Sequence, residues 1–240
     1  MTIDTNDLLN SIIESFDRMT YIQPEDIPNI DLYMDQVTTF MDDRLKASTR
    51  NKGEEKLMTK TMINNYAKNE VIPSPVKKKY SKEHILVLIM VYYFKSILQI
   101  NDIKELLDPV IDKFFGKGMD FGIEEIYKEI FDDKKEELGN IRDDVVSQYQ
   151  EAMTKFEDAP EGEKDYLKLY SFVCKLGCDV FVRKLMIEKI VDSIRTDRET
   201  REANEAKEEK KAKEKDKDRE KENKYDIPVE KKSKKASKEE

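Results

Sequence analysis

The sequence predicts a mainly α-helical protein, a helical bundle with one short extended segment and a disordered charged C-terminal tail. Apolar residues recur at three- and four-residue spacing along most of the chain, which is typical of helices with one buried face. Only 7 Gly and 7 Pro occur in 240 residues, too few for the many turns of an all-β fold. Residues 195–240 contain 17 Lys or Arg, 15 Asp or Glu and few large apolar residues. Such a tail buries too little surface to offset its ordering entropy.

The N-terminal part predicts two helices. The apolar periodicity indicates a first helix over residues 4–19. A break over residues 23–29, with two prolines, then leads to a second helix. Asn29 or Asp31 is expected to cap that helix by accepting bonds from its free N–H groups, and its apolar face runs to about Leu45.

A polar loop over 47–56 precedes a short helix over 57–69, for which Thr59 is the expected N-cap. Residues 71–80 are expected to be extended, because Pro73 and Pro75 and the residues before them avoid the α region.

Ser81 is expected to cap a helix over residues 82–98. Its run of ten apolar residues, 85–94, has no polar face, which predicts the central helix of the body. A bilayer requires about 20 such residues, so no membrane span is expected.

The remaining body predicts further helices joined by short breaks. A helix is expected over 101–107, a fresh helix start at Asp108-Pro109 and a loop over 116–122. Residues 123–156 form either one long helix or, as the pattern favours, two that meet near 132–140, and a turn follows over 159–163. The last helix, over 165–194, continues as a solvated helix to about 221, with disorder beyond Asn223.

Three regions follow from these elements. Residues 1–108 are expected to form an N-terminal helix plus a winged helix-turn-helix-like domain, residues 109–194 a helical partner or dimerisation region, and residues 195–240 the charged tail, partly helical and then disordered. The N-terminus has neither the basic start nor the apolar core of a signal peptide, and two cysteines do not require an oxidising compartment, so a cytoplasmic protein is expected.

Charge is distributed unevenly through the chain. Residues 44–82 contain 11 basic residues against Glu54, Glu55 and Glu70, whereas residues 1–43 contain ten acids and one arginine. A cationic segment in an acidic protein indicates a local polyanion site, because neutralised phosphates release counterions. A solvated, Lys-rich loop is the alternative. The order helix, loop, short helix, extended stretch and apolar helix is the layout of a winged helix-turn-helix, in which the second helix enters the major groove.

Three stretches in this segment, Thr59–Tyr66, Val71–Pro73 and Lys79–Glu83, resemble the DNA-binding domain of the MerR-type (mercury-resistance-regulator-like) transcription regulators. The resemblance covers about residues 56–107 and implies that the protein binds double-stranded DNA. It places ten residues at the interface: Thr59, Lys60, Thr61, Asn64, Asn65 and Tyr66 on the groove-facing helix, and Lys77, Lys78, Lys79 and Tyr80 in the wing. The body also resembles a group of uncharacterised bacterial proteins, defined only as a domain of unknown function, that share the Thr59–Tyr66 core.

The chain departs from the MerR-type pattern at several positions. That family usually has Arg in place of Asn64 and Gly in place of Glu70. The loop 47–56 intervenes before the recognition helix, and Pro109 and two glycines interrupt the place of the family's long dimerisation helix.

Other polar residues carry weaker functional alternatives. Cys174 and Cys178 are spaced i, i+4, but without further ligands they do not complete a zinc shell, and core packing is the favoured interpretation. His84, the only histidine, is expected at the surface or facing phosphate. The stripe that includes Leu138 and Tyr149 is either a coiled-coil dimer seam or intramolecular core.

The first hypothesis is therefore a non-enzymatic DNA-binding protein, a transcription regulator that needs no cofactor or metal. A homodimer is left open. The alternative is a helical protein-interaction adaptor with a degenerate winged-helix scaffold.

Overall fold

The structure is a computed structural model that describes residues 5–17, 21–46, 57–132 and 134–225. It divides the chain into two compact units, Met1–Asp192 and Ser193–Glu240. The elements are α1 (Thr5–Asp17), η1 (Pro24–Asp26), β1 (Leu32–Tyr33), α2 (Met34–Leu45), α3 (Lys60–Lys68), β2 (Lys79–Tyr80), α4 (Lys82–Phe94), α5 (Ile100–Phe114), α6 (Ile123–Phe131), α7 (Lys134–Met153) and α8 (Lys164–Tyr225). The mainly helical fold class is confirmed, whereas the boundary expected at residue 108 stays a prediction.

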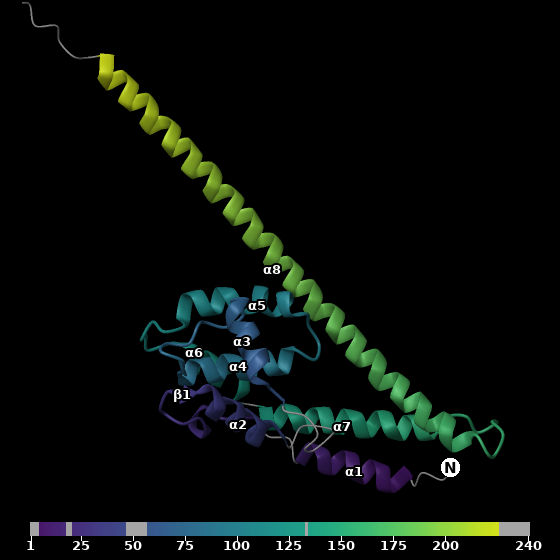
Figure 1. Cartoon of the computed structure of the whole chain (residues 1–240). Helices are drawn as coiled ribbons and strands as arrows, with labels where there is room; N and C mark the ends of the chain where they lie inside the picture. Colours follow the sequence, from purple (N-terminus) through teal and green to yellow (C-terminus); the bar gives the residue numbers. More distant parts are fainter. Residues whose placement is uncertain (1–4, 18–20, 47–56, 133, 226–240) are drawn as a thin grey trace, which may run out of the picture. The chain divides into compact units, whose positions relative to one another are not determined.

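Helix α4 is the centre of the main core, as its uninterrupted apolar run predicts (Figure 1). Every residue from His84 to Val91 is buried. The surrounding helices contribute one apolar stripe each to the same cluster, including Met41, Ile63, Ile103 and Tyr127. The helix ends at Phe94 rather than at residue 98, and a short turn leads into α5.

The region before α2 contains a strand that the sequence did not indicate. Leu32 pairs with Tyr80 and Tyr33 pairs with Lys79 in an antiparallel ladder. The expected caps, Asn29 and Asp31, therefore do not start α2. Tyr33 stands at its N-cap, and the side-chain oxygen of Gln36 accepts a hydrogen bond from the Tyr33 N–H at 2.8 Å. This pairing joins the start of α2 to the segment after α3.

Helix α5 corrects a second expectation, because Pro109 lies inside it rather than at a new helix start. A proline at this position removes one backbone hydrogen bond. The helix continues because residues on both sides of Pro109, including Leu107, Val110 and Phe114, pack against the main core.

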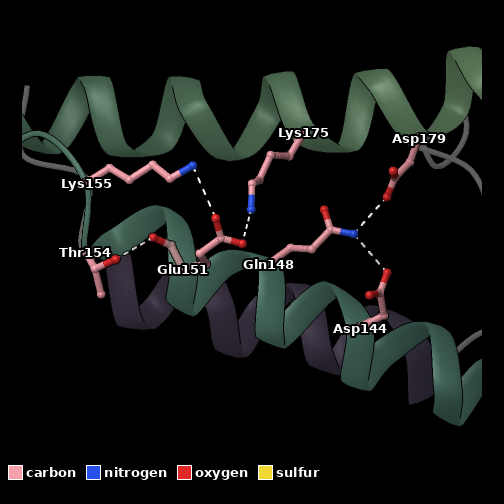
Figure 2. Close-up of polar contacts among 7 residues, drawn as sticks. All are labelled: Asp144, Gln148, Glu151, Thr154, Lys155, Lys175 and Asp179. Atoms are coloured by element: carbon pink, nitrogen blue, oxygen red, sulfur yellow. Dashed lines mark hydrogen bonds and ion pairs between the residues drawn. The ribbon is translucent and has the colours of Figure 1, made fainter.

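The helices after residue 122 agree with the sequence pattern. Two helices, α6 and α7, occupy this part of the chain, and α6 ends at Phe131, beside the expected break over 132–140. Tyr149 and Ala152 of α7 pack with Phe172 of α8, and residues of α1 cover them, so the stripe on α7 belongs at least partly to an intramolecular core. Polar bonds also join α7 to α8, as Figure 2 shows for Gln148 with Asp179 and for Glu151 with Lys175.

The second unit begins within α8, which reaches Tyr225 and so confirms a helix that continues through residue 221. Its side chains form pairs one turn apart, Arg198–Glu202, Asp197–Arg201 and Glu209–Lys213. The disorder expected beyond Asn223 falls mainly on residues 226–240, outside the described residues. Among the described residues, none of the helices has the length and apolar character needed to cross a membrane.

Candidate nucleic-acid interface

Helix α3 presents a polar face to solvent. Thr59 caps the helix, since its side-chain oxygen accepts a hydrogen bond from the Met62 N–H at 3.1 Å. Ile63 and Tyr66 are buried against the core. The exposed positions recur at one-turn spacing and contain only cationic, hydroxyl or amide side chains: Lys60, Thr61, Asn64, Asn65 and Lys68. We call this set the α3 outer face. It carries two positive charges and no acid.

The C-terminus of α3 ends in a Schellman motif that requires a left-handed residue. The Val71 N–H bonds to the Tyr66 carbonyl at 2.8 Å, and the Glu70 N–H bonds to the Ala67 carbonyl at 3.2 Å. Glu70 is the left-handed residue of this motif, with a φ of 57°. Glycine is the usual residue at this position because it has no Cβ to clash. The Glu70 carboxylate pairs with the Lys104 ammonium of α5 at 3.1 Å.

The segment before β2 is a two-residue hairpin turn whose tip consists of two lysines. Val76 and Lys79 exchange backbone hydrogen bonds of 3.1 and 3.0 Å. Lys77 and Lys78 between them have φ values of 51° and 65°. Positive φ at both central residues defines a type I′ turn, which usually contains Asn-Gly. Both lysines are exposed, and neither has an ion-pair partner among the described residues.

The first residues of α2 bring the start of α3 and the hairpin turn together. The Lys60 ammonium forms an ion pair with Asp35, in the first turn of α2. The Lys79 ammonium lies 5.2 Å from the ring centre of Tyr33, the residue before that helix. Because Tyr33 and Asp35 are two residues apart, Lys60 and Lys79 extend to the same end of α2. Cationic groups from two elements therefore lie near one another.

Two of the ten expected interface residues are packed inside the domain. Tyr80 is 2% exposed and Tyr66 is 9% exposed, and burial raises the pKa of both phenols. These two tyrosine side chains pack in the core beneath the candidate interface and are not part of its exposed surface. Thr59 is also committed to its helix cap. The exposed remainder therefore consists of Lys60, Lys77, Lys78, Thr61 and the two asparagines, while Lys79 is half-buried.

Two further described cations of the basic segment form ion pairs. Arg44 pairs with Asp26 at 3.5 Å, and Lys82 pairs with Glu124 at 2.9 Å. Arg50, Lys52 and Lys56 fall outside the described residues.

The expectation for His84 is wrong, because its imidazole is only 2% exposed. Its Nδ1 atom accepts a hydrogen bond from the Ser81 N–H at 3.1 Å and lies 2.8 Å from the Ser81 hydroxyl. Nε2 is buried without a hydrogen bond of ordinary geometry to any described residue. Burial lowers the pKa of His84, although the Ser74 backbone and the Asp31 carboxylate oppose that shift. His84 closes the cap of α4 and faces no solvent.

The favoured interpretation of the cysteines is also wrong, because Cys174 and Cys178 are both exposed on α8. In the described part of the chain no three potential metal-ligating side chains (His, Cys, Asp or Glu) lie together.

Three residues beyond the ten expected ones complete the candidate interface: Tyr33, Asp35 and Lys68. Lys68 belongs to the α3 outer face, and its spacing of four residues from Asn64 predicts that both residues lie on the same side of the helix. Tyr33 and Asp35 position Lys79 and Lys60, but they come from a strand and a helix start that no local pattern linked to the basic segment.

Comparison with known families gives one result for this region. Residues 22–130 match the family model described as "Domain of unknown function (DUF1836)". The match spans β1 to α6 and so includes the whole candidate interface, in agreement with the expected resemblance to an uncharacterised family. The comparisons with curated proteins and with solved structures give no significant match.

Proposed function

We propose that this protein is a non-enzymatic DNA-binding protein, a transcription regulator with a MerR-like winged helix-turn-helix. In this proposal the α3 outer face enters the major groove and the turn at Lys77 and Lys78 lies against the adjacent backbone. Lys60, Lys77 and Lys78 contact phosphates, which position the protein. Asn64 and Asn65 supply carboxamides, which can donate to and accept from the edge of adenine.

The observation that carries the proposal is the backbone conformation of the turn. Three of the four non-glycine residues with positive φ in the described part of the chain are Glu70, Lys77 and Lys78. A left-handed conformation costs a residue other than glycine about 1–2 kcal/mol. Unfavourable conformations of this kind concentrate at functional sites. Two exposed lysines at a turn that would be more stable with Asn-Gly indicate that the side chains serve a purpose other than folding.

The test is a pair of variants measured by fluorescence anisotropy on random-sequence duplex DNA at low salt. Lys77→Asn/Lys78→Gly relieves the strained turn and removes both charges. We expect weaker binding in a protein that is more stable, so that misfolding cannot explain the loss. The slope of log affinity against log salt should fall by about 1 for each lysine removed.

Two controls separate position from total charge. Lys77→Arg/Lys78→Arg keeps both charges and should retain affinity. Lys210→Ala/Lys211→Ala removes an adjacent, exposed lysine pair from α8 and should leave affinity unchanged. Equal binding by the Asn-Gly variant and the wild type would contradict the proposal.

One observation favours the alternative, a protein-interaction adaptor on a degenerate winged-helix scaffold. Outside the tail the chain has 27 basic and 37 acidic residues, and the Glu70 carboxylate lies at the C-terminal end of the α3 outer face. This net negative charge repels the phosphates of DNA. Binding that lacks a steep salt dependence would support the adaptor, since an adaptor need not release counterions.

A further inference from the structure

The hairpin turn and the β1–β2 ladder form one small sheet with two different sides. Leu32 pairs with Tyr80 and Tyr33 pairs with Lys79 between β1 and β2. Val76 pairs with Lys79 across the hairpin turn. Residues directly opposite one another in antiparallel segments point to the same side of the sheet. Tyr33, Lys79 and Val76 therefore share one side, and we call these three residues the hairpin face.

The hairpin face is apolar where a solvated side is expected to be polar. The other side belongs to the core, since Leu32 is 5% and Tyr80 is 2% exposed. On the hairpin face, Tyr33 is 54% and Val76 is 69% exposed. A sheet that is solvated on one side alternates apolar residues inward with polar residues outward. Strand propensity alone does not require this exception, because threonine has a comparable propensity and a polar side chain.

Cationic groups surround the apolar atoms of the hairpin face. The Lys79 ammonium lies 5.2 Å from the ring centre of Tyr33. Lys77 and Lys78 form the exposed tip of the same hairpin. Lys60, from the start of α3, pairs with the first turn of the helix that Tyr33 precedes.

This mixture of apolar and cationic groups indicates the chemistry of the partner. A sugar-phosphate chain alternates the apolar edges of its sugars with anionic phosphates, and proteins contact both to fix their position on DNA. An apolar protein surface would match the ring of Tyr33 but would leave the neighbouring ammonium groups without counter-charges. Charge complementarity therefore favours a nucleic-acid backbone at the hairpin face.

We propose that Tyr33 and Val76 pack against the deoxyribose sugars that adjoin the phosphates contacted by Lys77 and Lys78, an inference that rests on the proposed function. The tip of the hairpin then contacts phosphate, and its face covers the sugars beside them. This contact is apolar, so its contribution to affinity does not depend on counterion release. It carries no sequence information, because the sugars are the same at every base pair.

The test is Tyr33→Thr/Val76→Thr, measured by fluorescence anisotropy on random-sequence duplex DNA over a range of salt concentrations. Threonine keeps the strand propensity at both positions, and it is a preferred N-cap at the start of α2, so we expect the fold to be retained. Affinity should fall about tenfold, the loss expected when roughly 55 Å² of apolar surface is no longer buried. The slope of log affinity against log salt should stay unchanged, because no charge is removed.

Two control variants separate packing from other effects. Tyr33→Phe keeps the ring and loses the hydroxyl, so it should bind as the wild type does. Met119→Thr removes another large apolar residue, 47% exposed in the loop between α5 and α6, and should also leave affinity unchanged. Circular dichroism and urea denaturation check that each variant is folded.

The outcomes distinguish this inference from the proposed function. A wild type that does not bind DNA, or binds it equally well without Lys77 and Lys78, overturns both. Binding that needs those lysines but is unchanged in Tyr33→Thr/Val76→Thr overturns the sugar contact alone. A lower salt slope in the threonine variant would show that Tyr33 acts only by positioning Lys79. An equal loss in Tyr33→Phe would assign the effect to the hydroxyl group, and either result contradicts apolar packing.

Discussion

At the scale of single residues, backbone conformation conflicts with side-chain identity at the candidate interface. Glu70, Lys77 and Lys78 all have positive φ, although none is Gly, Asn or Asp, the residues that tolerate this region best. In the sequence, Glu70 stands out only as a departure from the MerR-type pattern. The structure adds the reason that glycine suits this position, namely the Schellman motif after α3.

Glu70→Gly should therefore stabilise the protein. The substitution removes the left-handed penalty, while the lost pair with Lys104 contributes little because the Glu70 carboxylate is largely solvent-exposed. We expect the free energy of unfolding to rise by about 1 kcal/mol in urea denaturation. Glu70→Asn is the control, because Asn tolerates the left-handed region but also lacks the charge. A variant less stable than wild type would contradict the cap geometry.

His84 should make stability depend on pH. Its pKa is lowered in the folded protein, so below the unfolded-state value of 6.5 the unfolded chain binds more protons than the folded one. The stabilisation is complete above about pH 6.5 and is lost as pH falls toward the folded-state pKa, with a slope of up to about 1.4 kcal/mol per pH unit.

His84→Asn keeps an acceptor for the Ser81 N–H and removes the titration. Urea denaturation between about pH 5 and 8 should give a flatter profile for this variant than for wild type. Since His84 is the only histidine, parallel profiles would show that the buried ring does not control the pH dependence.

At the scale of elements, the hairpin turn links stability to the proposed function. Val76 and Lys79 fix a two-residue turn, and β2 pairs with β1, so the turn cannot relax without disturbing the ladder. Lys77→Asn/Lys78→Gly should raise the free energy of unfolding by about 1–2 kcal/mol, which thermal melting measures as a higher Tm. Replacement by Ala-Ala, which keeps the unfavourable φ, should not raise it. Equal Tm values for the two variants would argue against a type I′ turn.

Pairing between elements explains why part of the candidate interface was not predictable from sequence. The one-turn spacing of Lys60, Asn64 and Lys68 is a local pattern and identifies the α3 outer face. The position of Lys79 over Tyr33 depends on strand pairing between residues 46 apart in the chain, for which two-residue strands leave no recognisable pattern. His84 was misplaced because its hydrophilic neighbours suggested solvent, whereas Phe115 from the end of α5 packs against its ring, with ring centres 4.7 Å apart.

At the scale of the whole molecule, the two units differ in what stabilises them. The first has buried apolar clusters, whereas the second has no buried side chain among its described residues and is stabilised as a helix by charged pairs. Pairs of this kind contribute a few tenths of a kcal/mol each. Residues 202–225, whose described side chains are all exposed, therefore should not contribute to the stability of the first unit.

Removal of residues 202–240 should leave the free energy of unfolding of the remaining chain, measured in urea, unchanged within about 0.5 kcal/mol. The helical signal in circular dichroism should fall at the same time, because most of the second half of α8 is lost. A large decrease in the midpoint would show that the tail stabilises the body.

The sequence alone determined the features that depend on neighbours along the chain: the helical periodicity, the buried α4, the Thr59 cap, the break between α6 and α7, and the exposed polar positions of α3. The tertiary structure decided those that depend on distant contacts: the β1–β2 pairing, the continuation of α5 through Pro109, the burial of His84 and the exposure of Cys174 and Cys178. The physical reason is the distance along the chain over which each interaction acts. Helix formation and capping act within about four residues, whereas burial depends on which other segment of the chain covers a residue.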